Sequence, residues 1–318
     1  MDGPLFSFRA VPILVGLLGE DAPRVFREAG LAADPAASEL VAPLRRVQGL
    51  LDVAAQATGR PALGIDIAER VPSGTLGFTE FLMRSAPTLM RGLEVLCEFA
   101  PLINPILDFR LDASPRRAAI HFVVPGERDG LGVHLNEYTF ALMFQQFSRV
   151  LGEPWRPMEL WLAHERAADR DAVSSRLGCP VVFGAASSGF AADRDALERK
   201  PPTADPVLFG FLLEQARAQL ATLAPSDVAI VARTIDARLP GDVSIDAVAA
   251  ALSTTSRSLQ RHLAAAGTSY RDLLQQVRRR KHAALSRSGA DEETIARKLG
   301  FADVKSMRRS LAIDRQPR

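Results

Sequence analysis

The chain has 318 residues, of which 47% are hydrophobic and 24% are charged, as in ordinary globular proteins of two or three domains. No apolar run reaches the roughly 18 residues that a membrane helix needs, so we expect a cytoplasmic protein with no membrane partner. Cys97 and Cys179 are the only cysteines. They are too few for a disulfide framework or a zinc ribbon, and we expect two separate buried thiols.

Common enzyme motifs are missing from the sequence. It contains no Gly-x-Ser-x-Gly elbow, no P-loop and no His-Glu-x-x-His pair. His134 and Glu137 share a helical face, but two such residues do not make a site. We therefore expect a protein that is not an enzyme, with no catalytic residues, no metal site and no cofactor.

The charge is divided unevenly along the chain. Residues 226–318 contain 17 Lys and Arg against 10 Asp and Glu, a net charge of +7, whereas the remainder contains 22 against 27, a net charge of −5. A basic third joined to an acidic body is typical of a DNA-binding module attached to a domain that does not bind DNA. A solvated charged face is the alternative that this pattern alone leaves open.

The first two thirds of the chain predict one α+β domain over 1–225. Apolar spacing predicts helices over 41–57, 78–83, 89–99 and 138–151. Alternating patterns predict strands over 106–111, 118–124, 158–164, 181–183 and 188–192. The first two strands are expected to form a hairpin that turns at Ser114-Pro115.

A long amphipathic helix over 205–223 closes this domain. Its apolar face is predicted to contain Val207, Leu208, Phe211, Leu212 and Ala216. Because such a face is too wide to leave in water, we expect the helix to pack on its own domain or on a partner subunit. The following Ala224-Pro-Ser226 is a natural domain boundary.

Residues 226–318 predict an all-α domain. An opening helix over 228–239 stops at Pro240-Gly241. Two stretches, 243–263 and 293–311, then share one plan: a short helix, a tight polar turn and a second helix with polar residues between apolar anchors. This is the layout of a helix-turn-helix, which reads DNA with its second helix. A long helix from about Tyr270 to Gly289 is expected to join them, as the fifth of seven helices.

The second helix of each stretch offers side chains for reading DNA. Leu259 and Leu263 are predicted to face the core, which leaves the polar residues between them outside. Arg can hold guanine and Gln can hold adenine through two hydrogen bonds each; solvated helix charge is the alternative. The predicted DNA-binding residues are Arg257, Ser258, Gln260, Arg261, Lys305, Ser306 and Arg309, with Asp303 as the N-cap of the last helix.

These motifs resemble the DNA-binding domain of the AraC/XylS family of bacterial transcription regulators. The resemblance covers about 242–311 and rests on Leu252-Ser-Thr-Thr-Ser-Arg-Ser-Leu-Gln-Arg, Gly267-Thr-Ser-Tyr-Arg-Asp-Leu-Leu, Val277-Arg, Ile295-Ala-Arg-Lys-Leu-Gly-Phe-Ala-Asp and Ser306. It implies that Arg257, Gln260 and Arg261 read bases and that Arg278 supports the fold. The rest of the basic run 278–281 is either a phosphate clamp or a solvated face.

The body of the chain resembles the arabinose-binding type of sensor domain found in one branch of the same family. This resemblance rests on Leu14-Val-Gly-Leu-Leu, Arg84-Ser-Ala-Pro-Thr-Leu, Gly178-Cys-Pro-Val-Val-Phe-Gly and Pro201-Pro-Thr-Ala-Asp-Pro. The C-terminal part departs from the family, which usually has Phe where Leu263, Met307 and Leu311 stand, and Ala at His282. The sequence also stops at Asp314-Arg-Gln-Pro-Arg318, so we expect a short last helix and a weakly held second helix-turn-helix.

Few residues of the predicted sensor domain point to chemistry. His121 and His164 lie on predicted strands and are expected to be hydrogen-bonded residues, not ligands. Arg84 and Arg110 suit either a carboxylate effector or structural salt bridges. The aromatic residues that either line an apolar pocket or fill the core are Phe99, Phe140, Phe144 and Phe147. No ligand-binding residues are predicted.

The favoured hypothesis is a one-component, ligand-responsive, sequence-specific DNA-binding transcription regulator of the AraC/XylS type. Residues 1–225 would sense the ligand and dimerise, and 226–318 would bind DNA. Its partners would be double-stranded promoter DNA, an unidentified small-molecule effector, a second copy in a homodimer and, as a further candidate, RNA polymerase. It would act as an activator or as a repressor. The alternative is a ligand-binding or protein-interaction protein whose DNA-binding domain has decayed at its C-terminus.

Overall fold

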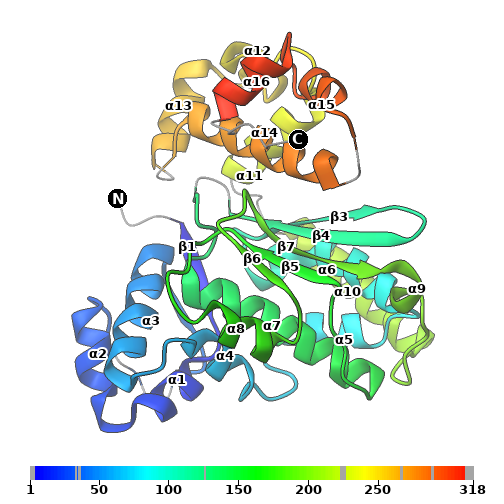
Figure 1. Cartoon of the computed structure of the whole chain (residues 1–318). Coiled ribbons are helices and arrows are strands. Elements are labelled where there is room, and N and C mark those ends of the chain that lie inside the picture. The colour runs from blue at the N-terminus through cyan, green and yellow to red at the C-terminus, as the bar shows by residue number, and fades with distance from the viewer. Residues whose placement is uncertain are drawn as a thin grey trace. The chain divides into compact units, whose positions relative to one another are not determined.

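The computed structural model describes residues 4–32, 34, 37–124, 127–222, 227–265, 268–287 and 290–311. Contacts divide the chain into two compact units, Asp2–Ala224 and Pro225–Arg318, called here the N-terminal and C-terminal units (Figure 1). The N-terminal unit mixes helices and strands, and the C-terminal unit contains helices alone within the described ranges. Among these residues no helix is long and apolar enough to cross a membrane.

The N-terminal unit combines two sheets with helices that cover them. In chain order its elements are β1 (Leu5–Phe8), α1 (Val11–Leu18), the 3-10 helix η1 (Gly19–Asp21), α2 (Ala22–Glu28), β2 (Leu40–Pro43), α3 (Leu44–Thr58), α4 (Leu63–Ala68), α5 (Phe78–Arg84), α6 (Leu89–Ile103), β3 (Asp108–Ala113), β4 (Arg117–Val123), α7 (Val133–Leu151), β5 (Glu159–Leu162), α8 (Arg170–Leu177), β6 (Val181–Phe183), β7 (Ser188–Asp193), α9 (Arg194–Leu197) and α10 (Pro206–Thr222).

The larger sheet has the strand order β3-β4-β7-β5-β6. Its neighbours are antiparallel except for β5 and β6, which run parallel. The predicted hairpin is confirmed as β3 and β4, with Ala113 opposite Ala118. Helix α7 packs on this sheet, since the rings of Phe140 and Phe144 lie 6.2 Å and 5.4 Å from the ring of Phe190 on β7. The sheet and α7 together form the centre of one large apolar core.

Helix α7 begins at Val133, earlier than the predicted start at Tyr138. Its first turns carry His134, Asn136 and Glu137, which are polar and precede the apolar stripe that predicts the helix, yet all three are buried. Asn136 Oδ1 accepts a hydrogen bond from the Leu131 amide at 3.1 Å, and Glu137 Oε1 accepts one from Arg166 Nη1 at 2.5 Å. Hydrophobic periodicity does not detect helical turns whose buried residues are polar.

Other predicted boundaries also differ from the structure. Val41 to Pro43 belong to β2, which pairs with β1, so α3 begins at Leu44 and not at Val41. His164 follows the end of β5 at Leu162 and does not lie on the strand. Both cysteines are free; Cys97 is partly buried and Cys179 is buried. Burial raises the pKa of Cys97 to about 12 and that of Cys179 to about 11.

Helix α10 packs on α5 and α6 through an apolar stripe that shares only Leu212 and Ala216 with the predicted one. Val207, Leu208 and Phe211 were expected on the packed face, but their side chains are 84%, 40% and 60% exposed. The residues of α10 in the contact are Phe209, Leu212, Leu213, Ala216 and Leu220. Both sets of positions have helical spacing, so the sequence is compatible with two overlapping apolar faces. Contact with α5 and α6 decides which of them is packed.

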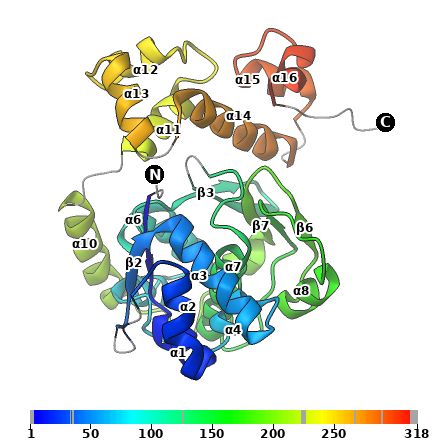
Figure 2. The same cartoon turned by 90° about the vertical axis from the view of Figure 1, so that its left-hand side faces the viewer.

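The C-terminal unit has six helices among its described residues, and the fourth joins two helix pairs (Figure 2). In chain order they are α11 (Asp227–Arg238), α12 (Ile245–Ala251), α13 (Ser256–Ala265), α14 (Tyr270–Arg287), α15 (Glu292–Lys298) and α16 (Val304–Leu311). The predicted order, with the joining helix as the fifth of seven, is wrong: among the described residues it is the fourth of six, because three helices and not four precede it. Helix α14 is unbroken through Val277, as its apolar stripe predicts.

Candidate nucleic-acid interface and effector pocket

The first helix pair, α12 and α13, presents a polar outer face over buried leucines. Leu259 and Leu263 are buried together with residues of α11, α12 and α14. Arg257, Gln260 and Arg261 are exposed on α13. This is the orientation that the sequence predicts, although exposure alone does not test base reading.

Short polar residues hold the ends of these helices. Ser244 Oγ accepts from the Ala247 amide at 3.3 Å at the start of α12, and Thr255 Oγ1 accepts from the Ser258 amide at 3.2 Å at the start of α13. Ser258 itself is half-buried. Hydroxyl caps of this kind satisfy amides that the helix leaves without a partner.

The second helix pair, α15 and α16, repeats the arrangement with carboxylate caps. Asp303 Oδ1 accepts from the Ser306 amide at 2.7 Å, as expected of the N-cap of α16, and its Oδ2 accepts from the Ser306 hydroxyl at 3.1 Å. Lys305 and Arg309 are exposed, whereas Met307 and Leu311 are buried. The hydroxyl of Ser306, a predicted DNA-binding residue, is therefore already engaged by the cap.

Three residues of the basic run 278–281 on α14 contact other parts of the C-terminal unit. The guanidinium of Arg278 lies 4.4 Å from the centre of the Phe301 ring, and burial lowers the pKa of Arg278. Arg280 is almost fully buried, 3.6 Å from Asp236 Oδ1, and Lys281 Nζ donates to the Asp236 carbonyl at 3.0 Å. Neither the phosphate clamp nor the solvated face therefore describes Arg280 and Lys281. The fold-supporting role that the family resemblance implies for Arg278 agrees with its ring contact.

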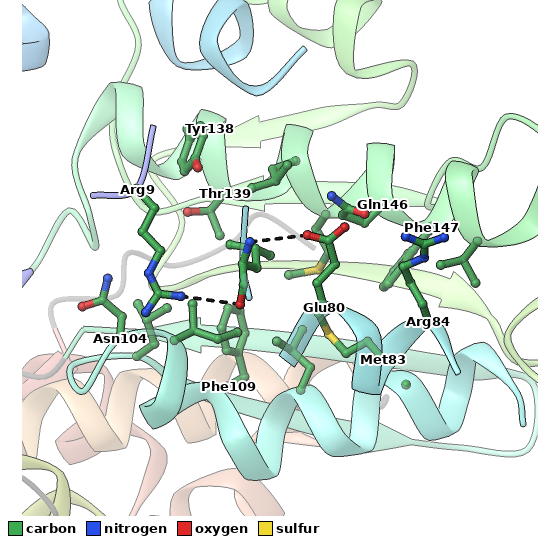
Figure 3. A pocket seen from close by; sticks show the side chains of 18 of the residues that line it. Arg9, Glu80, Met83, Arg84, Asn104, Phe109, Tyr138, Thr139, Gln146 and Phe147 are labelled. Carbon is green, nitrogen blue, oxygen red and sulfur yellow. Dashed lines mark hydrogen bonds between the residues drawn. The ribbon is translucent and has the colours of Figure 1, made fainter. Parts of the chain in front are cut away.

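The N-terminal unit contains a mainly apolar pocket bounded by β1, α5, α6, β3 and α7 (Figure 3). The volume of this cavity is about 100 Å³. The polar residues on its wall are Ser7, Arg9, Glu80, Arg84, Asn104, Tyr138, Thr139 and Gln146. A concave, mainly apolar site with a few polar groups is the usual form of a small-molecule site.

Several wall residues are held by the protein itself. Glu80 is buried and accepts hydrogen bonds from the Ser73 hydroxyl and the Gly74 amide, both at 2.8 Å. Asn104 Nδ2 donates to the Ser7 carbonyl at 2.9 Å and fixes β1 against the end of α6. These bonds keep the walls in place before any ligand enters.

The structure separates the candidate residues of the sequence. Phe147 and Arg84 line the pocket, whereas Phe99 and Phe140 are buried in the core. Phe144 packs in the core and also borders a shallower hollow beside α4 and α8. Arg110 forms the salt bridge that was one of its two predicted roles: its Nη2 lies 3.2 Å from Asp108 Oδ2.

His121 and His164 are buried groups with partners. His121 Nε2 lies 3.2 Å from Asp112 Oδ2, and His164 Nδ1 lies 3.0 Å from Asn136 Nδ2. This agrees with their expected hydrogen-bonded role. The pocket residues Glu80, Tyr138 and Gln146 are not among the residues predicted from the sequence. The signal that could have found them is a polar side chain within an otherwise apolar helix, at Glu80 in α5 and at Tyr138 and Gln146 in α7.

Comparison with known proteins gives the family. Residues 19–201 match the model of the arabinose-binding domain of AraC transcription regulators, N-terminal. The chain belongs to this family, which confirms the resemblance stated from its motifs.

Its similar relatives are transcription regulators. The HTH-type transcriptional regulator VirS of Mycobacterium tuberculosis is 28% identical over 268 residues, which cover 82% of this chain and 78% of VirS. The ornithine utilization regulator of Pseudomonas aeruginosa is 26% identical over 256 residues, which cover 79% of this chain and 75% of that protein. The crystal structure of the transcriptional regulator CdpR from Pseudomonas aeruginosa aligns with a TM-score of 0.48 and 23% identity, covering 94% of this chain and 92% of CdpR.

Proposed function

We propose that the protein is a one-component, ligand-responsive transcription regulator that binds specific DNA sequences through its C-terminal unit. The observation that carries this proposal is the repeated helix pair, in which a buried apolar anchor turns a basic, polar face outward on α13 and again on α16. The family and its relatives support regulation of transcription. The two pairs have the layout of helix-turn-helix units, with α13 and α16 as the helices that enter the major groove.

Base reading is assigned to side chains on these two helices. Arg257, Gln260 and Arg261 extend from α13 into solvent, where two-pronged hydrogen bonds to guanine and adenine are within the reach of such side chains. Ser258 on α13 and Lys305, Ser306 and Arg309 on α16 complete the proposed interface. The Ser306 hydroxyl already donates to Asp303, so we assign Ser306 to a phosphate contact at the start of α16. We assign the larger share of base discrimination to α13.

The N-terminal unit is the proposed sensor and dimerisation domain. Its pocket would hold the effector, which changes DNA binding only if it has different affinities for two states of the protein. The exposed Val207, Leu208 and Phe211 on α10 form an apolar patch that a second copy would cover. Sedimentation of a Phe211→Asp variant tests the dimer: a shift to monomers supports it, and an unchanged mass contradicts it.

The experiment that tests DNA binding starts from a pool of duplexes with a randomised centre. The full chain should enrich a defined sequence, and its affinity should fall steeply with salt because lysine and arginine contacts release counterions from DNA. RNA polymerase recruitment would then be measured by transcription from a promoter that carries the enriched site. Absence of binding to any duplex at low salt would leave the alternative, a ligand-binding protein without DNA-binding activity.

A further inference from the structure

The charged groups on the wall of the pocket are balanced by the protein. Arg9 Nε lies 3.4 Å from Glu39 Oε1. Arg84 Nη1 donates to the Ser73 hydroxyl at 2.8 Å, and that hydroxyl donates to Glu80 Oε1 at 2.8 Å, so the arginine and the carboxylate are linked through one serine. The charges of Arg9, Glu39, Arg84 and Glu80 therefore sum to zero, so a ligand meets no net charge at this wall.

One uncharged group on the same wall is left without a partner. Gln146 on α7 is only 5% exposed, yet neither its amide oxygen nor its amide nitrogen has a hydrogen-bond partner among the described residues. A buried amide without a partner is costly, and Leu would fill the same space without that cost. Figure 3 shows Gln146 among the side chains that surround the pocket, so a ligand is the natural source of the missing hydrogen bonds.

The rest of α7 sets the shape of the ligand. Tyr138, Leu142 and Gln146 all line the pocket and follow one another at one-turn spacing. At a rise of 1.5 Å per residue, Tyr138 and Gln146 are about 12 Å apart along the helix axis. The wall between them is formed mainly by apolar side chains such as Met143 and Leu96. A molecule that fills this space is therefore elongated and mainly apolar.

We propose that the pocket selects an uncharged, elongated and mainly apolar small molecule whose amide, carbonyl or hydroxyl group is hydrogen-bonded by Gln146. This rests on the proposed function in so far as that molecule is the effector. An anion or a cation of the same length would lose its hydration without meeting a net opposite charge on the wall, and it is disfavoured for that reason. The discriminating feature is thus the charge of the head group and not the length of the chain.

The test compares three probes with one alkyl chain: octanamide, octanoate and octylammonium. Each is titrated into the full chain by calorimetry, with the melting temperature as a second readout. We expect octanamide to bind at least about tenfold more tightly than either ion. Octanoate or octylammonium binding as tightly as octanamide would overturn the proposal.

Two neighbouring substitutions on α7 test the role of Gln146. Gln146→Leu should weaken octanamide about tenfold, and the unliganded melting temperature should not fall because no protein hydrogen bond is lost. Gln145→Leu is the matched control: Gln145 lies outside this pocket and donates to the Glu69 carbonyl at 3.2 Å, so the variant should keep the parent affinity. Equal affinities for octanamide in the two variants contradict the assignment.

DNA binding is measured separately, so the two proposals can fail independently. If octanamide binds with the expected discrimination but leaves the affinity for the enriched duplex unchanged, the assignment of the pocket stands and ligand-responsive regulation falls. If octanamide changes DNA affinity in the parent and not in Gln146→Leu, both are supported. If none of the three probes binds a chain that does bind DNA, the pocket assignment falls alone.

Discussion

The two helix pairs of the C-terminal unit share one layout but depend on different forces. The first pair packs into a cluster that also includes Val231 and Ile235 of α11 and Leu273 of α14. Among the described residues, the second pair packs into a smaller cluster of five buried apolar residues, with Leu285 and a few other partly buried residues around them. Its caps are carboxylates, where those of the first pair are hydroxyls. Burial of apolar side chains therefore stabilises the first pair, whereas charged helix caps contribute a larger share of the stability of the second pair.

The largest effect expected from this difference follows removal of one leucine from the smaller cluster. Leu299 is fully buried there, and Leu299→Ala should cost about 2–5 kcal/mol. Because so few apolar residues remain, α15 and α16 should lose amide protection in hydrogen exchange while α11 to α13 keep theirs. Leu263→Ala, the control in the larger cluster, should leave its own helices folded. Equal loss of protection across the whole unit in Leu299→Ala contradicts the two-cluster picture.

A second comparison concerns DNA. Arg257→Ala or Gln260→Ala in α13 should weaken binding to the enriched duplex by about 1–3 kcal/mol and relax preference at one or two base pairs. Arg309→Ala in α16 should have a smaller effect on preference, because Ser306 beside it is engaged by the cap. Fluorescence anisotropy on enriched and scrambled duplexes at two salt concentrations measures both.

The control for this comparison is a basic residue on the joining helix. Arg279→Ala should weaken enriched and scrambled duplexes alike and reduce the salt slope, if α14 touches phosphate. A result in which Arg257→Ala and Gln260→Ala behave in the same way as Arg279→Ala would remove base reading from α13.

The turns of the two pairs offer a reciprocal exchange. The residue after the C-cap of the first short helix is Ser253, whose φ is 52°, and its counterpart in the second pair is Gly300, whose φ is 75°. A left-handed conformation suits glycine, so Ser253→Gly should stabilise the protein by up to about 1 kcal/mol in urea unfolding. Gly300→Ser should destabilise it, since a Cβ there would lie 3.0 Å from the Pro240 carbonyl oxygen. Changes of the same sign in both variants would contradict this account.

The smallest expected effect is a difference in acid sensitivity. Hydrogen bonds from the Thr294 and Ser306 amides lower the pKa of Asp291 and Asp303 below the usual range. A carboxyl whose folded pKa is lowered stabilises the fold above its unfolded pKa, about 3.9, and this contribution is lost as pH falls through the folded pKa. The Ser244 amide lowers the pKa of Asp242 before α12 in the same way, so the first pair has one such carboxyl and the second has two. The second pair should therefore loosen first in acid. Replacing both caps by Ser should remove the difference in amide exchange between the pairs, and its persistence would refute the role of the caps.

How far the sequence predicts this structure depends on what each segment packs against. The outward face of α13 follows from periodicity, because one side of the helix is apolar and the other is not. The strand at Val181–Phe183 follows from its run of β-branched and aromatic residues. The start of α7 does not, because Glu137 is buried with Arg166, a partner distant in sequence. The packed face of α10 does not either, since two apolar stripes compete. Gln146 could not be assigned to a pocket without α5 and α6 in place.

The unbroken helix α14 has a consequence for how such a sequence can change. Its 18 residues span about 27 Å, and each residue added inside it would turn the second helix pair by about 100° and advance it by about 1.5 Å. A single insertion would therefore rotate α16 relative to α13 about the axis of α14. Under the proposed function, the two helices could then no longer enter the same face of one duplex. Insertions and deletions inside α14 would be tolerated only when they amount to nearly whole helical turns, because the helix fixes both the angle and the distance between α13 and α16.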